Sequence, residues 1–189
     1  SPSYNHMIQN EISKIDGAKR QIETAIELFF SQKDYVSTVV LTYGAWNLIK
    51  DLSKHQKQEN SRDYLLQHLQ EKNPNINPSD VWKTLHTDWN FFKHAKTDPH
   101  KAMSIDINAL RLALFLASMD TLYLNIESCV INTYIFWFIA SDNTPYIQDN
   151  SLEEIVTKAN DRFPNFHKLS FEQRCKYGSK ALKKCTRKR

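Results

Sequence analysis

Residues 88–101, DWNFFKHAKTDPHK, contain several side chains suited to acid-base chemistry. The segment carries two histidines, and histidine is the side chain whose ordinary pKa lies closest to neutral pH. A hydrolase could use His94 together with Asp88 or Asp98 as an acid-base pair. His94 and Asp88 are therefore the candidate catalytic residues if the protein is an enzyme.

The sequence before this segment predicts a helix over about residues 78–96, with Asn77 as its N-cap and Pro78 at its first position. Asp88 falls in the middle of an apolar stripe made by Val81, Leu85 and Phe92, with Trp89 and Phe91 at its edges. A carboxylate there must be hydrogen-bonded, exposed at a gap or shifted in pKa. The simplest interpretation is structural, with Tyr43, Asn47 and Lys50 as candidate partners by type.

A polar stripe on the opposite face of the same predicted helix contains His86, Asn90 and His94, spaced by four residues. Lys93 lies directly beside it in the sequence. The two histidines are one turn further apart than a metal-binding i, i+4 pair, and no carboxylate completes a site, so no metal is predicted. The stripe is interpreted as a surface that faces water or a partner helix.

The positive charge of the chain is concentrated at its C-terminal end. Residues 168–189 contain nine Lys or Arg and one Glu, whereas residues 1–167 contain 16 Lys or Arg and 20 Asp or Glu. Such a segment can bind phosphate backbones or an acidic protein, although a solvated helix end is the simpler interpretation. The predicted contacts are Lys176, Lys180, Lys183 and Lys184.

Length and composition predict one all-α domain. With 189 residues and 41% hydrophobic content the chain can bury one sizeable core, and three glycines leave few positions for tight hairpins. We expect a helical bundle over residues 7–163, with Met7 as the start, and a basic C-terminal helix or tail over 164–189. No glycine-rich phosphate loop occurs, and no cofactor is predicted.

Apolar periodicity divides the chain into helices separated by short polar breaks. Gly44 is expected to permit close helix approach, and Ser151 to cap one helix. Besides the helix at 78–96, the pattern predicts helices over about residues 8–31, 35–53, 62–71, 106–126, 128–141 and 152–162.

The three cysteines are an odd number without C-x-x-C spacing, which fits reduced thiols in a cytoplasmic protein. The N-terminal residues show no secretory signal pattern. The most apolar run, residues 129–140, has twelve residues, whereas a membrane span needs about 20. We therefore predict a cytoplasmic protein without membrane association.

Residues 15–52 followed by NFFKHAKTDP resemble a group of uncharacterised bacterial helical proteins in which an N-F-F-K-H-A-x-x-D-P block recurs. The resemblance covers roughly residues 15–140 and depends mainly on Asn90 to Pro99. More distantly, the chain is similar to HEPN domains, helical bundles found in RNases of toxin and defence systems. That resemblance implies HEPN-like up-and-down packing with additional C-terminal helices.

The HEPN motif is an arginine followed after four to six residues by a histidine, the position that His94 would take. The three positions allowed for the arginine hold Thr87, Asp88 and Trp89, so the guanidinium that stabilises phosphate charge is missing. Two other pairs have the spacing, Arg62 with His68 and Arg162 with His167, and Pro164 interrupts the second.

Two interpretations follow from these features. The first is a HEPN-like, non-catalytic module that binds RNA or a protein partner through the His86/Asn90/His94 face and the basic tail. The alternative is a metal-independent RNase or other hydrolase that uses His94. Because the motif face of HEPN-like assemblies often lies at a dimer interface, the resemblance also implies a two-fold homodimer.

Overall fold

The computed structural model describes residues 11–58, 60–94, 99–141 and 153–186. Every regular element in these ranges is a helix, so the predicted all-α, single-domain fold is confirmed. The elements are α1 (Lys14–Ser31), α2 (Tyr35–His55), α3 (Ser61–Lys72), α4 (Pro78–Leu85), α5 (Thr87–Lys93), α6 (Ile107–Tyr123), α7 (Cys129–Ser141), α8 (Glu153–Arg162), the 3-10 helix η3 (Phe166–Lys168) and α9 (Phe171–Thr186).

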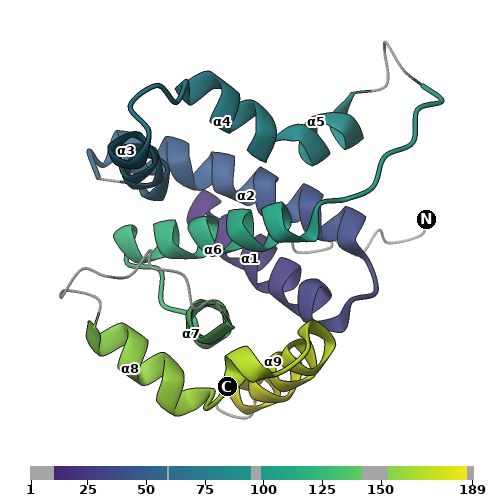
Figure 1. The fold of residues 1–189 in the computed structure, drawn as a ribbon, viewed down its shortest axis with the longest axis vertical. Coiled ribbons are helices and arrows are strands. Elements are labelled where there is room, and N and C mark those ends of the chain that lie inside the picture. The colour runs from purple at the N-terminus through teal and green to yellow at the C-terminus, as the bar shows by residue number, and fades with distance from the viewer. Residues whose placement is uncertain (1–10, 59, 95–98, 142–152, 187–189) are drawn as a thin grey trace, which may run out of the picture.

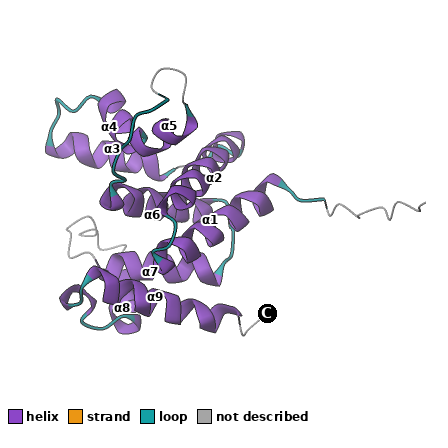
Figure 2. Ribbon diagram, turned by 90° about the vertical axis from the view of Figure 1, so that its right-hand side faces the viewer, coloured by secondary structure: helices purple, strands orange, loops and turns teal. Residues whose placement is uncertain are grey.

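The helices form a central layer with smaller groups at either end (Figures 1 and 2). Helix α1 packs along α2, α2 packs along α6, and α7 lies next to α6 and α1. Helices α3, α4 and α5 cover one end of this layer, and α8 and α9 cover the other. The two ends therefore present different surfaces on one shared core.

Helix α1 begins later than the predicted start at about residue 8. The backbone N–H of Asp16 donates to the Ser13 hydroxyl at 3.0 Å, so Ser13 is the N-cap and the helix starts at Lys14. A serine that accepts from the first turn ends the helix on its N-terminal side. Ile12, expected on the apolar face, lies outside the helix and is 53% exposed.

The predicted helix over 78–96 is two helices, and the expectation of one continuous helix is wrong. Asn77 and Pro78 begin α4 as predicted, with the Ser79 N–H donating to the Asn77 side chain at 2.9 Å. The chain leaves helical geometry at His86, where φ is −95° and ψ is 5°, and α5 follows. This break changes which way the side chains after His86 face.

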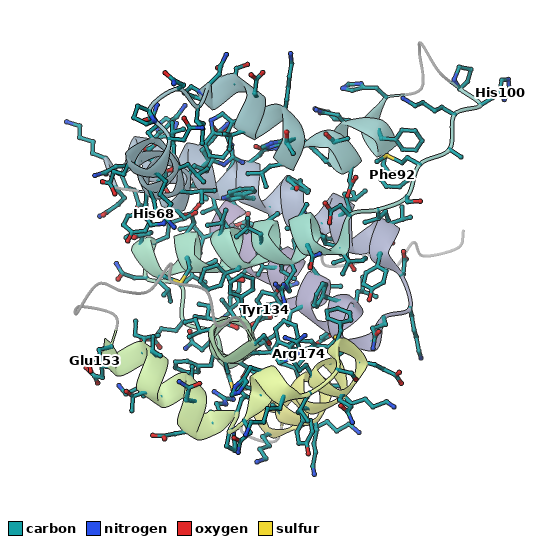
Figure 3. The ribbon with its side chains drawn as sticks, in the orientation of Figure 1. His68, Phe92, His100, Tyr134, Glu153 and Arg174 are labelled. Carbon is teal, nitrogen blue, oxygen red and sulfur yellow. A yellow bond between two sulfur atoms is a disulfide. The ribbon has the colours of Figure 1, made fainter. Side chains whose placement is uncertain are left out.

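The core contains a cluster of aromatic rings where α1 meets α7. Phe29 and Phe30 of α1 lie against Tyr134 and Trp137 of α7, with ring centroids 5.1–5.8 Å apart. All four side chains are buried, and Figure 3 shows Tyr134 in the interior of the molecule. Aromatic packing of this kind contributes beyond the apolar area that it buries.

Helix α7, the most apolar in the chain, is part of this core. Its sequence, CVINTYIFWFIAS, is buried at nearly every position between α6, α8 and α9. Within the ranges that the structure describes, no helix combines the length and the apolar content required to cross a membrane.

The glycine that permits close helix approach is Gly178 on α9, and the expectation for Gly44 is wrong. A Cβ at Gly178 would lie 2.6 Å from ring atoms of Phe30, whereas a Cβ at Gly44 would meet nothing within 4 Å. The missing side chain at Gly178 lets α9 lie directly on the Phe30 ring. Helix α9, from the segment predicted as a basic helix or tail, is thereby packed into the core.

Two of the three cysteines form a disulfide, so the expectation of three reduced thiols is wrong. Cys129 at the start of α7 and Cys185 near the end of α9 have Cα atoms 5.6 Å apart and share an S–S bond. Cys175 is unpaired and buried, and burial raises the pKa of its thiol to about 12. The paired cysteines are 56 positions apart in the sequence, and this separation gives no sign of their proximity.

Candidate functional site: a lysine-lined groove

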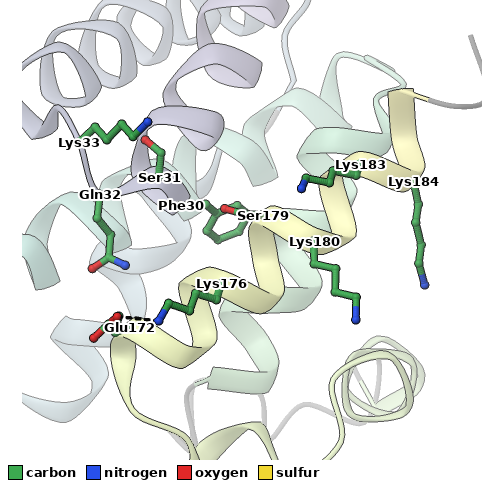
Figure 4. A pocket seen from close by; sticks show the side chains of 10 residues that line it. All are labelled: Phe30, Ser31, Gln32, Lys33, Glu172, Lys176, Ser179, Lys180, Lys183 and Lys184. Atoms are coloured by element: carbon green, nitrogen blue, oxygen red, sulfur yellow. Dashed lines mark ion pairs between the residues drawn. The ribbon is translucent and has the colours of Figure 1, made fainter.

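A depression with a volume of about 760 Å³ lies between α9 and the turn that joins α1 to α2 (Figure 4). Its floor includes the ring of Phe30, and Ser31, Gln32 and Ser179 add polar groups to its walls. We call this depression the basic groove, because its charged lining consists of one glutamate, Glu172, and five lysines: Lys33, Lys176, Lys180, Lys183 and Lys184.

The α1–α2 turn supplies Lys33, which sequence reasoning missed. Gln32 has φ 56° and ψ 21°, and its N–H closes α1 on the carbonyls of Leu28 and Phe29. Asp34 then starts α2 by accepting the Ser37 N–H at 2.9 Å, which leaves only a short turn around Lys33. A left-handed residue that ends a helix followed by an N-cap is a recognisable pattern, but it does not say which helix lies opposite.

The spacing of the α9 lysines places them along one side of the helix. Lys176, Lys180, Lys183 and Lys184 lie at i, i+4, i+7 and i+8, and all four are exposed. Neighbours three or four positions apart on a helix are about 5–6 Å apart at Cβ. The structure therefore brings the four predicted lysines together and adds Lys33 to them.

Several contacts fix α9 beside the groove. The Trp137 indole N–H donates to the Arg174 carbonyl at 2.7 Å, and the Arg174 guanidinium donates to the Ser141 carbonyl at 2.9 Å. Figure 3 shows Arg174 between α7 and α9. With the close contact at Gly178 and the disulfide at Cys185, these bonds hold the lysine-bearing side of α9 towards solvent.

The electrostatics of the groove are those of a cation-rich surface in water. Lys176 makes a 2.8 Å ion pair with Glu172, and this contact lowers the pKa of the Glu172 carboxyl. Both partners are exposed, so the pair contributes little to stability. The remaining four lysines outnumber the single carboxylate, and the groove suits a ligand with several negative charges.

The other end of the molecule contains a buried group of aromatic and charged residues, which we call the Trp46 cluster: Tyr43, Trp46, Arg62, His86 and Asp120. The guanidinium carbon of Arg62 lies 4.1 Å from the centre of the Trp46 ring. Its Nη2 donates to the Asn47 side chain at 3.2 Å, and its Nε has no hydrogen-bond partner among the residues that the structure describes. Burial lowers the pKa of Arg62, and Asp120 opposes that effect.

Asp120 of α6 is the carboxylate at the centre of the Trp46 cluster. It accepts the Trp46 indole N–H at 2.8 Å and the backbone N–H of Ser61 at 2.5 Å. Burial raises its pKa, and the hydrogen bonds that it accepts oppose this shift. Asp120 thus joins α2, the start of α3 and α6.

His86 lies inside the Trp46 cluster and is half-buried. Its ring stacks on Trp46 at 8° with centroids 6.0 Å apart, and its Nδ1 lies 2.9 Å from the Trp82 carbonyl. Burial lowers the pKa of His86, the hydrogen bond to the Trp82 carbonyl opposes this shift, and the positive charges of Arg62 and Lys50 add to it. Of the two surroundings predicted for this stripe, water or a partner helix, His86 has the second, because its ring lies against Tyr43 and Trp46 of α2.

The other residues of the predicted stripe are separated from His86. Asn90 and His94 are exposed, but His94 has extended backbone geometry at the end of α5, with φ −131° and ψ 127°, and leaves the helical face. Lys93 is exposed and its ammonium lies 4.4 Å from the Trp89 ring centre. The structure does not assemble His86, Asn90 and His94 into one surface.

Asp88 is buried and connects α5 to the start of α6. It accepts the backbone N–H of Asp106 at 3.1 Å, and Asp106 in turn caps α6. Burial raises the pKa of Asp88, against the effect of that hydrogen bond. The hydrogen-bonding partner of Asp88 is thus a backbone amide 18 positions along the chain. It is not one of the side chains proposed from the sequence. Asp98 lies outside the described residues.

The two arginine–histidine pairs with HEPN-like spacing lie in different parts of the structure, on α3 and between α8 and η3. Arg62 and His68 are six residues apart on α3, which places them on different sides of the helix. Arg162 donates to the Thr133 hydroxyl at 2.7 Å, while His167 is exposed in η3 beyond Pro164.

A second depression, of about 680 Å³, lies beside the disulfide. Glu23, Glu27 and Glu127 line it together with Lys19 and Arg162, and the Ser128 hydroxyl donates to Glu23 at 2.7 Å. Three carboxylates and two cationic side chains line it, so it lacks the excess of positive charge of the basic groove. Among the described residues, no group of three or more His, Cys, Asp or Glu side chains could hold a metal ion.

Comparisons of the chain with protein-family models, with curated proteins and with solved structures found no match.

Proposed function

We propose that this protein is a non-catalytic helical module that binds RNA through the basic groove. The observation that carries the proposal is the placement of Lys33 opposite the four lysines of α9 around one depression. Proteins bind nucleic acid chiefly by neutralising phosphates with lysine and arginine, and a cluster of such side chains on one face is the corresponding feature of the protein.

The character of the groove favours a nucleic acid over a protein as the ligand. Interfaces between proteins are depleted in lysine and enriched in aromatic residues. The basic groove has the opposite character, since five lysines line it and its one aromatic ring, Phe30, is 2% exposed. An acidic protein partner is the alternative outcome of the binding experiment.

The candidate catalytic residues Asp88 and His94 do not line the groove. Its lining contains no histidine and no cysteine, and its carboxylate is paired with Lys176. The candidate catalytic pair is divided, with Asp88 buried against Asp106 and His94 exposed at the end of α5. These placements support binding over the alternative, an RNase or hydrolase that uses His94.

The HEPN-like relationship and a two-fold dimer near His94 remain part of this proposal. A cytoplasmic location is proposed too, and the Cys129–Cys185 disulfide makes it testable, because disulfides are rare in the cytosol. Alkylation of thiols in intact cells, followed by mass spectrometry of the two cysteine peptides, tests that location.

Salt-dependent RNA binding tests the proposed function. Log affinity for a fluorescent RNA should fall linearly with log salt, by about 0.7 per phosphate contact for a single strand. Replacing Lys33, Lys180, Lys183 and Lys184 by Gln should weaken binding and flatten that slope. A control variant replaces four exposed lysines outside the groove, Lys54, Lys57, Lys83 and Lys101. Equal losses in the two variants would contradict the groove.

A cleavage assay separates the module from the enzyme. Pure protein is mixed with structured and unstructured RNA, without metal and then with Mg²⁺ or Mn²⁺. We expect no cleavage above that of a His94→Ala variant. Cleavage that His94→Ala abolishes would establish the alternative, in which His94 is the acid or base.

A further inference from the structure

We propose that the basic groove binds single-stranded RNA and that Tyr177 is the platform on which one of its bases stacks. The inference rests on the proposed function, because it names the form of RNA that the groove accepts. Tyr177 is a large exposed side chain on α9, with 53% of its surface accessible. Tyr177 is not among the binding residues predicted from the sequence.

Helical spacing places Tyr177 beside the lysines. Lys180 and Lys184 follow it at i+3 and i+7, so all three lie on one side of α9. Lys180 and Lys184 also line the groove (Figure 4). A strand whose phosphates contact these two lysines would have bases within reach of the Tyr177 ring.

The tyrosine ring is supported from the protein side. Its edge contacts Phe166, with ring centroids 6.2 Å apart and planes at 79°. Phe166 is buried and packs against Phe163 and Trp137. A ring held in place by a buried neighbour while more than half of its surface is in water loses little freedom when a base stacks on it.

An exposed aromatic ring beside lysines distinguishes single strands from duplexes. In a duplex the base faces are stacked on one another, and double-stranded RNA is recognised by shape and by phosphate and 2′-OH contacts. Proteins that bind single strands combine a basic groove with aromatic rings on which unpaired bases stack. A depression of about 760 Å³ also has the size of a small-ligand cleft and accepts a strand more readily than a helix.

Tyr64 on α3 provides a matched control inside the same protein. It is also 53% exposed, but the residues at i+3 and i+7 from it are Gln67 and Glu71. If exposure alone made a tyrosine a stacking platform, Tyr64 and Tyr177 would behave alike. If the neighbouring lysines are required, only Tyr177 contributes.

Fluorescence anisotropy with a labelled 12-nucleotide RNA and the corresponding 12-base-pair duplex tests the inference. We expect the single strand to bind more tightly, and Tyr177→Ala to weaken it about tenfold, the lower range for loss of one stacked base. Tyr177→Phe and Tyr64→Ala should stay within about twofold of wild type. The salt slope should be unchanged in Tyr177→Ala, because no phosphate contact is lost.

Each outcome bears on one proposal. If neither RNA form binds, or if the groove-lysine and control-lysine variants lose affinity equally, the proposed function itself fails. If RNA binds through the lysines but Tyr177→Ala binds like wild type, or the duplex binds as tightly as the single strand, only the stacking inference is overturned. Tyr177→Leu replaces Tyr177→Ala if circular dichroism shows that the alanine variant is not folded, and the same tenfold loss is expected.

Discussion

The basic groove and the Trp46 cluster both contain positive charge, but they place it in different surroundings. Around the groove five lysines project from two elements into solvent. In the Trp46 cluster, Arg62 lies against an indole, and the nearby Asp120 carboxylate accepts two buried N–H groups. The first arrangement leaves charge available to a ligand, whereas the second uses charge to connect helices.

This difference shows that residue type alone does not identify a site. Arginine, histidine and aspartate are common in active sites, and a group with a shifted pKa in a cleft is a candidate for function. Here burial accounts for most of the shifts at Arg62, His86 and Asp120, and the side chains hold α2, α3 and α6 together. The exposed lysines that line one groove are the better candidates for binding.

The largest effect should come from removing the carboxylate of the Trp46 cluster. Asp120→Ala would leave the Trp46 indole N–H and the Ser61 backbone N–H without their acceptor in a buried site. Loss of one partner of a buried, hydrogen-bonded charge costs about 3–5 kcal/mol of unfolding free energy. Urea denaturation followed by tryptophan fluorescence measures this loss.

The matched control for Asp120 is an exposed aspartate on a neighbouring helix. Asp80→Ala on α4 should change the unfolding free energy by no more than about 0.5 kcal/mol, as is usual for surface sites. RNA affinity of folded Asp120→Ala should match wild type, because the groove lies at the other end of the molecule. A small loss of stability in Asp120→Ala would mean that this cluster is not what joins the helices.

The sequence predicted most of the helices because their signals are local. The Asn77–Pro78 start of α4 and the bounds of α2 follow from capping chemistry and apolar periodicity. The break at His86 was missed, since the apolar pattern runs on through it and the ring is held by Tyr43 and Trp46 of another helix. A tertiary contact overrode the local pattern there.

Contacts between distant segments could not be predicted in the same way. The four lysines of α9 were identified from charge alone, but Lys33 belongs to the groove only because α9 packs on α1. The Cys129–Cys185 disulfide and the Gly178–Phe30 contact likewise depend on that packing. The partner of Asp88 was missed because it is a backbone amide, which any residue type can supply.

A smaller loss of stability should come from Gly178→Ala on α9, the helix that carries most of the groove lysines. The new Cβ would lie 2.6 Å from the Phe30 ring, so α9 or the ring must move. Such overpacking costs about 1–3 kcal/mol, which exceeds the gain of up to about 1 kcal/mol from replacing a helical glycine. Thermal denaturation should show net destabilisation, and weaker RNA binding should accompany it if α9 shifts.

Two other helical glycines are controls for Gly178. Gly17 on α1 and Gly44 on α2 have nothing within 4 Å of an added Cβ. Alanine at either position should therefore stabilise the protein by about 0.5–1 kcal/mol, the intrinsic difference between glycine and alanine in a helix. If Gly178→Ala were stabilising to the same degree, α9 would not be seated on Phe30.

The smallest effect concerns the pH dependence of stability from His86. Burial lowers the pKa of His86 in the folded protein, whereas an unfolded histidine titrates near 6.5. As the pH falls below about 6.5, the unfolded chain binds a proton that the folded protein resists, so stability falls until the folded His86 is itself protonated. The slope from this one group cannot exceed about 1.4 kcal/mol per pH unit.

His86→Asn should remove this component while keeping an N–H donor for the Trp82 carbonyl, because the Asn amide nitrogen is bonded to Cγ as the His86 Nδ1 is. We therefore expect wild type to lose more unfolding free energy than His86→Asn between pH 7.5 and 5.5, measured by urea denaturation at each pH. The other histidines are present in both proteins, so their contributions to the pH dependence of the unfolding free energy cancel when the two proteins are compared. If the unfolding free energies of the two proteins changed with pH in parallel, His86 would be exposed to water in the folded protein, like the lysines of the groove. The Trp46 cluster would then not differ from the groove at this residue.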